Sequence, residues 1–176
     1  LPRLLGETLS AADADAGILY LADNDMLAPA AAIKGDGTTL AINSGNIDSK
    51  ACGPLLSSAL LSGSPYAARL TASDIKSLGL ADTVQTSPTQ NAIAVPLLNR
   101  QQNLVGAMIL LRNEATDEAR LSFIGALSGS AAVSLENKEL IKAQKMLFEA
   151  FIKLIAGAID AKSPYTGGHC AHIPKL

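Results

Sequence analysis

The stretch between Asp117 and Pro164 constrains the fold of this chain most, because it contains no proline. Apolar residues recur in it at steps of three and four, which places a stripe on one face of an α-helix. A first row consists of Ile124, Leu127, Ala131, Ser134, Ile141, Phe148, Ile152, Ile155 and Ile159, and a second of Leu140, Leu147, Phe151, Leu154 and Ala158. The pattern predicts one long amphipathic helix from Asp117 to about Asp160.

Such a helix carries more apolar surface than the rest of the chain can cover. The residues before Asp117 are enough for one ordinary domain and too few for two. We therefore expect part of the stripe to bind another surface, most simply the same helix of a second chain in a homodimer. The alternative is a helix that packs only on its own domain.

The first quarter of the chain predicts a helix and two strands. Leu1 to Ala12 has apolar residues at helical spacing, and Ala16 to Leu21 is typical of a short buried strand. Asp23-Asn24-Asp25 predicts a turn, and Leu27 to Lys34 an antiparallel partner strand. Gly35-Asp36-Gly37 ends this strand in a second turn, without the spacing of a phosphate-binding loop.

Two further helices are expected in the middle of the chain. Asp48 or Ser49 can cap a helix that runs through Ala51 to Leu60. Thr71 to Asp74 has the pattern of a capping box and predicts a short helix ending at Gly79.

A β-hairpin is the clearest signal before the long helix. After an expected loop over Thr83 to Gln90, two apolar runs, Asn91–Leu98 and Leu104–Leu111, are joined by the polar turn 99–103. Pro96 has no N–H to donate, so we expect it at an edge or a bulge. The element order predicts an α+β fold, with an antiparallel sheet flanked by helices.

Composition excludes several classes of function. The formal net charge of −2 gives no basic surface for nucleic acid. The most apolar stretch, Leu147 to Ile159, is interrupted by Glu149 and Lys153, so we expect no membrane contact by this segment. No signal peptide is evident, and Cys52 and Cys170 form neither a CxxC pair nor a disulfide framework, which fits a reducing compartment. We therefore expect a cytoplasmic location, and an upstream membrane anchor in the parent protein stays open.

The hairpin resembles the core of GAF domains. Val95-Pro96-Leu97, a short polar turn and Leu104 to Leu110 match the family's pattern, and the resemblance covers about residues 1–135. It implies five or six antiparallel strands and a pocket for an unknown small molecule, between the sheet and the Asp48–Gly79 region. The related PAS-type sensor fold has a similar layout, and many GAF domains serve only for dimerisation.

Cyclic nucleotide binding is not indicated. The GAF domains that bind cyclic nucleotides carry a signature of Asn, Lys, Phe, Asp and Glu after the last strand. This chain has Asn113 followed by Glu114 in place of Lys, and it lacks the Phe. Asp117 and Glu118 are better explained as favourable charges at the N-terminus of the long helix.

A second resemblance concerns the C-terminal end. Ile159 to His169 is similar to the opening of HD-GYP domains, phosphodiesterases that hydrolyse cyclic di-GMP at two or three divalent metal ions of the iron or manganese type. The resemblance implies that His169 is a metal ligand in the complete domain. Cys170 and His172 depart from the family's usual Ser and Arg. The family's remaining motifs would follow Leu176, so we expect the sequence to be part of a longer protein.

The sequence therefore predicts three parts: a GAF-like sensory domain (1–135), a connecting signalling helix (136–160) and the start of an HD-GYP domain (161–176). The fragment has no catalytic residues of its own, because its two histidines cannot assemble a Ser-His-Asp or Cys-His set. Two alternatives stay open. One is a pure interaction module, and the other is the sensor of a different HD-type metal-dependent phosphohydrolase.

Three groups of residues are candidates for local chemistry. His169, Cys170 and His172 could bind zinc, but a stable site needs three or four fixed ligands, so we expect a metal-free end in the isolated fragment. Cys52 is expected to be a small buried thiol rather than a sensing cysteine. Four aspartates around the first strand could bind calcium but are also what turns and caps require: Asp13, Asp15, Asp23 and Asp25.

Overall fold

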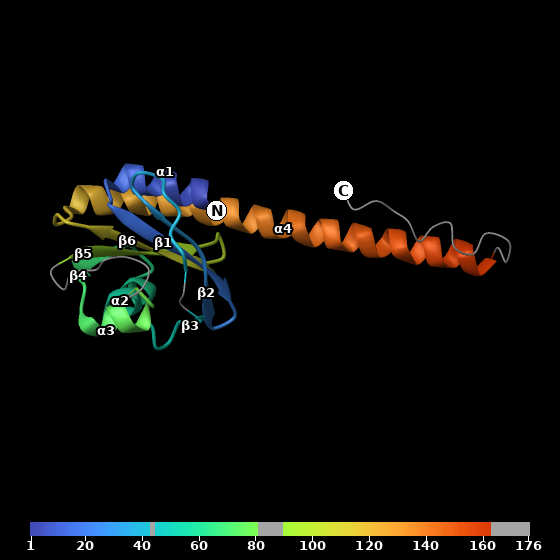
Figure 1. Ribbon diagram of the computed structural model, residues 1–176, viewed down its shortest axis with the longest axis horizontal. Helices are drawn as coiled ribbons and strands as arrows, with labels where there is room; N and C mark the ends of the chain where they lie inside the picture. The colour runs from blue at the N-terminus through green and yellow to red at the C-terminus, as the bar shows by residue number, and fades with distance from the viewer. Residues whose placement is uncertain (43–44, 81–89, 163–176) are drawn as a thin grey trace. The chain divides into compact units, whose positions relative to one another are not determined.

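The computed structural model describes residues 1–42, 45–80 and 90–162. The chain divides into two units, Leu1–Leu135 and Glu136–Leu176, and each is described by itself. The first unit has the predicted α+β fold, in which a curled antiparallel sheet lies between helices on both of its faces (Figure 1).

The helices and strands follow one another in a simple order. They are α1 (Pro2–Ala12), β1 (Ala16–Asp23), β2 (Met26–Lys34), β3 (Ile47–Asp48), α2 (Pro54–Ser62), β4 (Tyr66–Arg69), α3 (Ala72–Ser77), β5 (Asn91–Leu98), β6 (Leu104–Arg112) and α4 (Glu118–Lys162). The strands form one sheet in the order β3-β2-β1-β6-β5-β4, in which every neighbouring pair is antiparallel.

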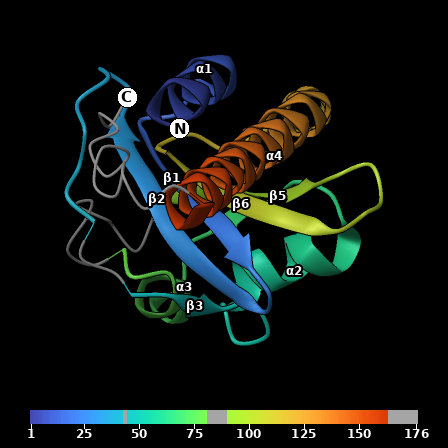
Figure 2. The same cartoon turned by 90° about the vertical axis from the view of Figure 1, so that its right-hand side faces the viewer.

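The sheet buries side chains on both faces. Helix α1 and the start of α4 cover one face, and α2 and α3 cover the other (Figure 2). Along β5, Ala92 and Ala94 belong to the core under α2, whereas Ile93 and Val95 belong to the core under α1 and α4. This is why β5 has a continuous apolar run instead of alternating with polar residues.

The hairpin forms as predicted, and Pro96 lies where its missing N–H has no cost. Pro96 pairs with Ala107 of β6, but β4 pairs with β5 only as far as Ala94. Among the described residues, the proline therefore has no strand partner on its other side, and a register shift follows at once between Leu97 and Leu98.

The predicted start of the second helix is wrong. Asp48 lies in β3, and its Oδ1 accepts a hydrogen bond from the Lys50 N–H at 2.8 Å instead of capping a helix. Helix α2 begins at Pro54, after Gly53 at φ 85°. Proline is favoured in the first turn because the N–H it lacks would have had no helical partner.

Helix α4 forms over the predicted range, and the acidic pair at its start has the expected place. The Oδ1 of Asp117 accepts a hydrogen bond from the Arg120 N–H at 2.8 Å, which satisfies one of the free donors of the first turn. Glu118 adds a negative charge to the same turn.

The predicted first row of α4 is not one continuous face. Its members Ile124 and Ala131 are buried against the sheet, together with the neighbouring Leu135, whereas its member Ser134 is exposed. Ile141 follows Ile124 by seventeen residues, a spacing that displaces its side chain by roughly a quarter turn around the helix. The face that packs on the sheet is therefore different from the face that is apolar after residue 136.

We expect Gly106→Ala to destabilise the first unit by roughly 1–3 kcal/mol, the usual cost of overpacking a closely packed interior. A Cβ at Gly106 would lie 2.5 Å from the backbone oxygen of Tyr20 in the neighbouring central strand. Urea unfolding followed by circular dichroism measures the change. Gly129→Ala is the control, since nothing lies within 4 Å of its Cβ position. Equal stability of the two variants would contradict this explanation.

Candidate functional site

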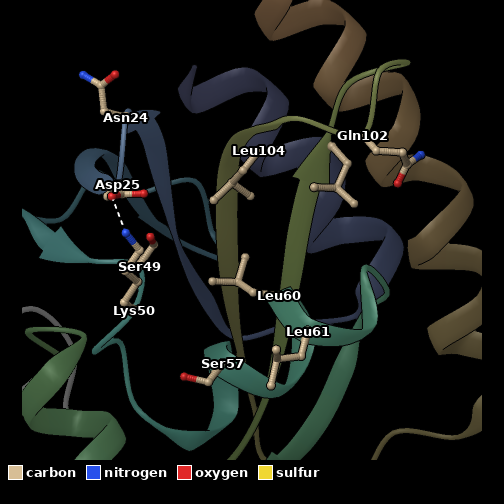
Figure 3. Close-up of a pocket in the computed structure, with 10 residues that line it drawn as sticks. Asn24, Asp25, Ser49, Lys50, Ser57, Leu60, Leu61, Gln102 and Leu104 are labelled. Carbon is tan, nitrogen blue, oxygen red and sulfur yellow. Dashed lines mark hydrogen bonds and ion pairs between the residues drawn. The ribbon is translucent and has the colours of Figure 1, made fainter.

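A groove of about 560 Å³ opens at the end of the sheet where the β1–β2 and β5–β6 turns lie (Figure 3). Its polar wall consists of Asn24, Asp25, Ser49 and Lys50, and its apolar wall of Leu60, Leu61, Leu98 and Leu104. Ser57 and Gln102 complete the lining. The volume is typical of a small-molecule site. The GAF resemblance implies a pocket between the sheet and the Asp48–Gly79 region, and Ser49, Lys50, Ser57, Leu60 and Leu61 of that region line this groove.

An ion pair stands in the polar wall. The Nζ of Lys50 donates to Oδ2 of Asp25 at 2.5 Å, and the two side chains are 72% and 67% exposed. This hydrogen bond, and then the negative charge of Asp25, raise the pKa of Lys50 above its ordinary value. Lys50 is therefore positively charged at neutral pH. The groove thus offers one cation and one anion side by side.

Backbone hydrogen bonds hold the polar wall in place. The N–H of Ser49 donates to the carbonyl of Asp25 at 2.9 Å, which joins the segment after β3 to the β1–β2 turn. The sequence alone does not predict this contact, because Asp25 and Lys50 lie twenty-five residues apart and only the β2–β3 pairing brings them together. The local sequence Asp23-Asn24-Asp25 indicates only the turn itself, not the contact with Lys50.

Cys52 lies directly behind the groove and is fully buried, as expected of a small structural thiol. Its Sγ donates to the carbonyl of Ser49 at 3.1 Å and lies 3.5 Å from the Oγ of Ser57. The expectation that Cys52 lies on a helix is wrong, because the residue precedes Gly53 and Pro54, where α2 begins. Its contacts support the wall of the groove.

Asp74 joins the two helices that cover this face of the sheet. Its buried carboxylate accepts hydrogen bonds from the N–H of Thr71 at 3.0 Å and from the N–H of Leu55 at 2.9 Å. The first bond, with the reciprocal bond from the Asp74 N–H to Thr71 Oγ1, is the predicted capping box of α3. The second satisfies a donor at the start of α2, so one side chain serves two helices.

Asp13 caps α1 and lies between two arginines. It has a left-handed backbone at φ 52°, and its Oδ2 lies 3.5 Å from Arg120 Nη1 and 4.0 Å from Arg112 Nη2. The guanidinium of Arg112 is buried and donates to the carbonyl of Ala12. These contacts connect the end of α1, the end of β6 and the first turn of α4.

The other three aspartates around β1 have separate partners. Asp15 accepts from the Asn113 N–H at 3.0 Å, Asp23 accepts from the neighbouring Asn24 amide, and Asp25 pairs with Lys50. Within residues 1–42, 45–80 and 90–162, no group of three or more His, Cys, Asp or Glu side chains could hold a metal ion. The structure therefore gives the calcium alternative no support there.

The predicted metal ligand His169 lies outside the described residues, together with Cys170 and His172. Most of the expected loop 83–90 lies outside them as well. Among the described helices, none has both the length and the apolarity that a membrane span requires.

Tyr20 is a buried titratable group on the face of the sheet that α2 and α3 cover. Its hydroxyl donates to the carbonyl of Leu78 at 2.8 Å, and burial raises the pKa of the phenol well above the ordinary value of 10.0. Because the folded state binds this proton more tightly, the associated stability is fully present below pH 10 and is lost as the pH rises from there toward the folded-state pKa.

We therefore expect the free energy of unfolding to fall above pH 10 by up to about 1.4 kcal/mol per pH unit from this group. Tyr20→Phe should remove that part of the slope while costing about 1 kcal/mol at neutral pH for the lost hydrogen bond. Urea titrations at a series of pH values measure both effects. The exposed Tyr66→Phe is the control and should keep the wild-type slope. An unchanged slope in Tyr20→Phe would contradict this assignment.

The fold and the groove together define a class of protein. The first unit has a curled six-stranded antiparallel sheet that is covered by helices on both faces, and its last helix is the start of the long α4. The chain belongs to the GAF domain family, whose model matches residues 1–135. Residues 1–135 are thus a domain of the sensory and regulatory kind found in bacterial signalling proteins.

Solved structures share this fold at low sequence identity. A GAF domain/HD domain protein from Geobacter sulfurreducens is 19% identical, with a TM-score of 0.58 over 78% of this chain and 91% of that one. The GAF domain of a two-component sensor histidine kinase from Bacillus halodurans is 20% identical, with a TM-score of 0.57 over 81% and 97%.

A type II free methionine-R-sulfoxide reductase from Thermoplasma acidophilum is 14% identical, with a TM-score of 0.51 over 77% of this chain and 93% of that one. At such identities these likenesses show the fold alone. No curated protein matches this chain.

Proposed function

We propose that residues 1–135 are the sensory domain, and α4 the dimeric connecting helix, of a cytoplasmic signalling protein whose catalytic part is a cyclic di-GMP phosphodiesterase of the HD-GYP type. The observation that carries the proposal is the exposed apolar face of α4 after residue 136. In the single chain its large apolar side chains are between 36% and 72% exposed: Leu140, Ile141, Leu147, Phe148, Phe151, Ile152, Leu154, Ile155 and Ile159.

These side chains occupy about half of the circumference of the helix. The charged residues in the same turns, Lys142, Glu149 and Lys153, occupy the other half. An exposed apolar surface of this extent is typical of an interaction site. The spacing of seven between Leu140, Leu147 and Leu154 is that of a coiled coil, so a second copy of the helix is the simplest cover.

The same register extends back into the GAF domain. Ala119, Ala126 and Val133 precede Leu140 at steps of seven, and the exposed Phe123 lies beside them on the outward side of α4. No charged residue occurs anywhere between Leu121 and Leu135. A surface helix whose outward side lacks charge over four turns suits close contact with another helix, which supports an interface along the whole of α4.

Coupling between sensor and helix would use the Asp13 contacts. Arg112 ends β6 and Arg120 lies in the first turn of α4, so a ligand that shifts the sheet would also shift the start of the helix. In our proposal such a ligand favours one packing of the paired helices, and the catalytic domain responds to that population shift. No step requires a catalytic residue within the described chain.

The phosphodiesterase part of the proposal rests on the match of Ile159 to His169 with the HD-GYP opening, and a GAF domain/HD domain protein with this fold exists in Geobacter sulfurreducens. In the proposal His169 is one of the ligands of two or three divalent ions of the iron or manganese type. The residues that follow Leu176 in the intact protein test this directly. A His-Asp pair and a later Gly-Tyr-Pro element would support it, and an HD-type domain without that element would favour a different phosphohydrolase.

Sedimentation equilibrium of the chain tests the dimer. We expect a reversible dimer at micromolar concentration and higher, because an apolar helix face of this length is costly to expose to water. A strict monomer at high concentration would overturn the proposal. In the intact protein, His169→Ala should reduce the metal content and abolish hydrolysis of cyclic di-GMP, while leaving the dimer unchanged.

A further inference from the structure

We infer that the groove between the β1–β2 turn and α2 binds a small zwitterion with an aliphatic body, which is the chemistry of a free apolar α-amino acid. This inference rests on the proposed sensory function and names the class of ligand for it.

The charges of the groove favour a ligand with no net charge. Its lining contains one cation, Lys50, and one anion, Asp25. A phosphate group would find a single ammonium beside a carboxylate that repels it, which disfavours nucleotides. Among the described residues, the lining also has no aromatic ring on which a base could stack and no His or Cys that could bind a haem or a chromophore.

The ion pair itself is complementary to a zwitterion. Lys50 Nζ has three donors and the Asp25 carboxylate about four acceptor positions, so their mutual contact uses only a fraction of either. The pair is mostly exposed, and an exposed pair contributes little to stability. A carboxylate can therefore bind Lys50, and an ammonium can bind Asp25, without breaking a costly interaction.

The apolar wall suits an aliphatic side chain. Leu60 and Leu104 are half-buried, and Figure 3 shows their side chains beside the polar wall, above α2. Leu61, which is 90% exposed, forms the outer lip of the groove. A branched aliphatic chain placed between them would be removed from water together with the exposed parts of these leucines.

The groove is also preformed. The bond from the Ser49 N–H to the Asp25 carbonyl fixes the two segments of the polar wall to each other. The Asp48 carboxylate fixes the backbone of Lys50 at 2.8 Å. A site whose charged groups already converge loses less conformational freedom on binding.

Titration of the complete chain with L-leucine, followed through the methyl signals of Leu60 and Leu104 by NMR, tests the inference. We expect saturable shifts with leucine. Glycine lacks the aliphatic body, 4-methylpentanoate lacks the ammonium and 3-methylbutylamine lacks the carboxylate, so each should bind at least about tenfold more weakly. Asp25→Asn and Lys50→Met should each weaken leucine binding by about tenfold. Arg3→Met removes another exposed ion pair, to Glu7 at 3.0 Å, and should leave binding unchanged.

Two results would overturn the inference. One is the absence of shifts up to about 10 mM leucine, isoleucine, valine or methionine, a range that detects even millimolar affinities. The other is 4-methylpentanoate binding as tightly as leucine, which would show that the ammonium is not recognised. Sedimentation of the same samples keeps the two proposals apart: a dimer that persists without amino-acid binding refutes the ligand class alone, and a monomer refutes the dimeric helix.

Discussion

Asp74→Ala is expected to lower the free energy of unfolding by about 3–5 kcal/mol, because each buried donor left without a partner costs about 1–3 kcal/mol and each lost helix cap about 1 kcal/mol. Asp74 is 1% exposed, and its carboxylate accepts hydrogen bonds from the N–H of Leu55, the N–H of Thr71 and the hydroxyl of Thr71. The alanine variant leaves these donors without a partner, and it uncaps α2 and α3 together. Urea unfolding at neutral pH measures the loss.

Asp48→Ala is the matched control for this prediction. Asp48 is exposed and accepts one backbone hydrogen bond, from the Lys50 N–H at 2.8 Å, so its removal should cost less than about 1 kcal/mol. Asp74→Asn keeps the shape of the side chain and one acceptor oxygen, so its loss of stability should lie between those of Asp74→Ala and Asp48→Ala. If Asp74→Ala were no less stable than Asp48→Ala, the carboxylate would not be what joins α2 to α3.

The parts of the fold that depend on local chemistry were predictable from the sequence. The capping box at Thr71 and Asp74 involves residues three apart, and the hairpin at Asn91–Arg112 involves two apolar runs and one short turn. Both follow from rules that act within a few residues of the chain. The family resemblance at the hairpin has the same basis, because the core of the sheet is made there.

The parts that depend on contacts between distant segments were not predictable. The start of α2 was misplaced because its cap comes from Asp74, nineteen residues further along the chain. The sequence did contain a signal, Pro54, because proline is favoured in the first turn of a helix and disrupts a helix interior. The Lys50–Asp25 pair of the groove has no local signal beyond the turn residues, because β3 brings the two segments together.

The register of α4 shows a further limit on what the sequence predicts. Periodicity identifies which residues of a helix are apolar, but it does not say which surface covers each of them. Ile124 and Ala131 face the sheet, whereas Leu147 and Phe151 are exposed in the single chain, yet one pattern contains all four. The structure separates the residues that pack on the sheet from the apolar residues that are exposed in the single chain, and this separation makes the proposed dimer testable one residue at a time.

Phe151→Glu is expected to weaken dimerisation by at least about 100-fold. Phe151 lies near the middle of the apolar face and is 57% exposed in the single chain. A dimer buries two copies of it, each worth about 2 kcal/mol, and the substitution also places two like charges in an apolar interface. Sedimentation equilibrium measures the change in the dissociation constant.

Met146→Glu is the matched control, since it exchanges a similarly exposed apolar residue, at 63%, for the same charge on the opposite side of the same helix. It should leave the dissociation constant within about threefold of the wild-type value, a change in binding free energy of less than about 1 kcal/mol. If both variants dissociated equally, the position of the glutamate on the helix would not matter. The cause would then be either the added charge itself or unfolding of the helix, and circular dichroism distinguishes the two. A Phe151→Glu protein that dimerises as tightly as the wild type would place the partner on another surface, because an interface built on this face cannot hold two glutamates at its centre.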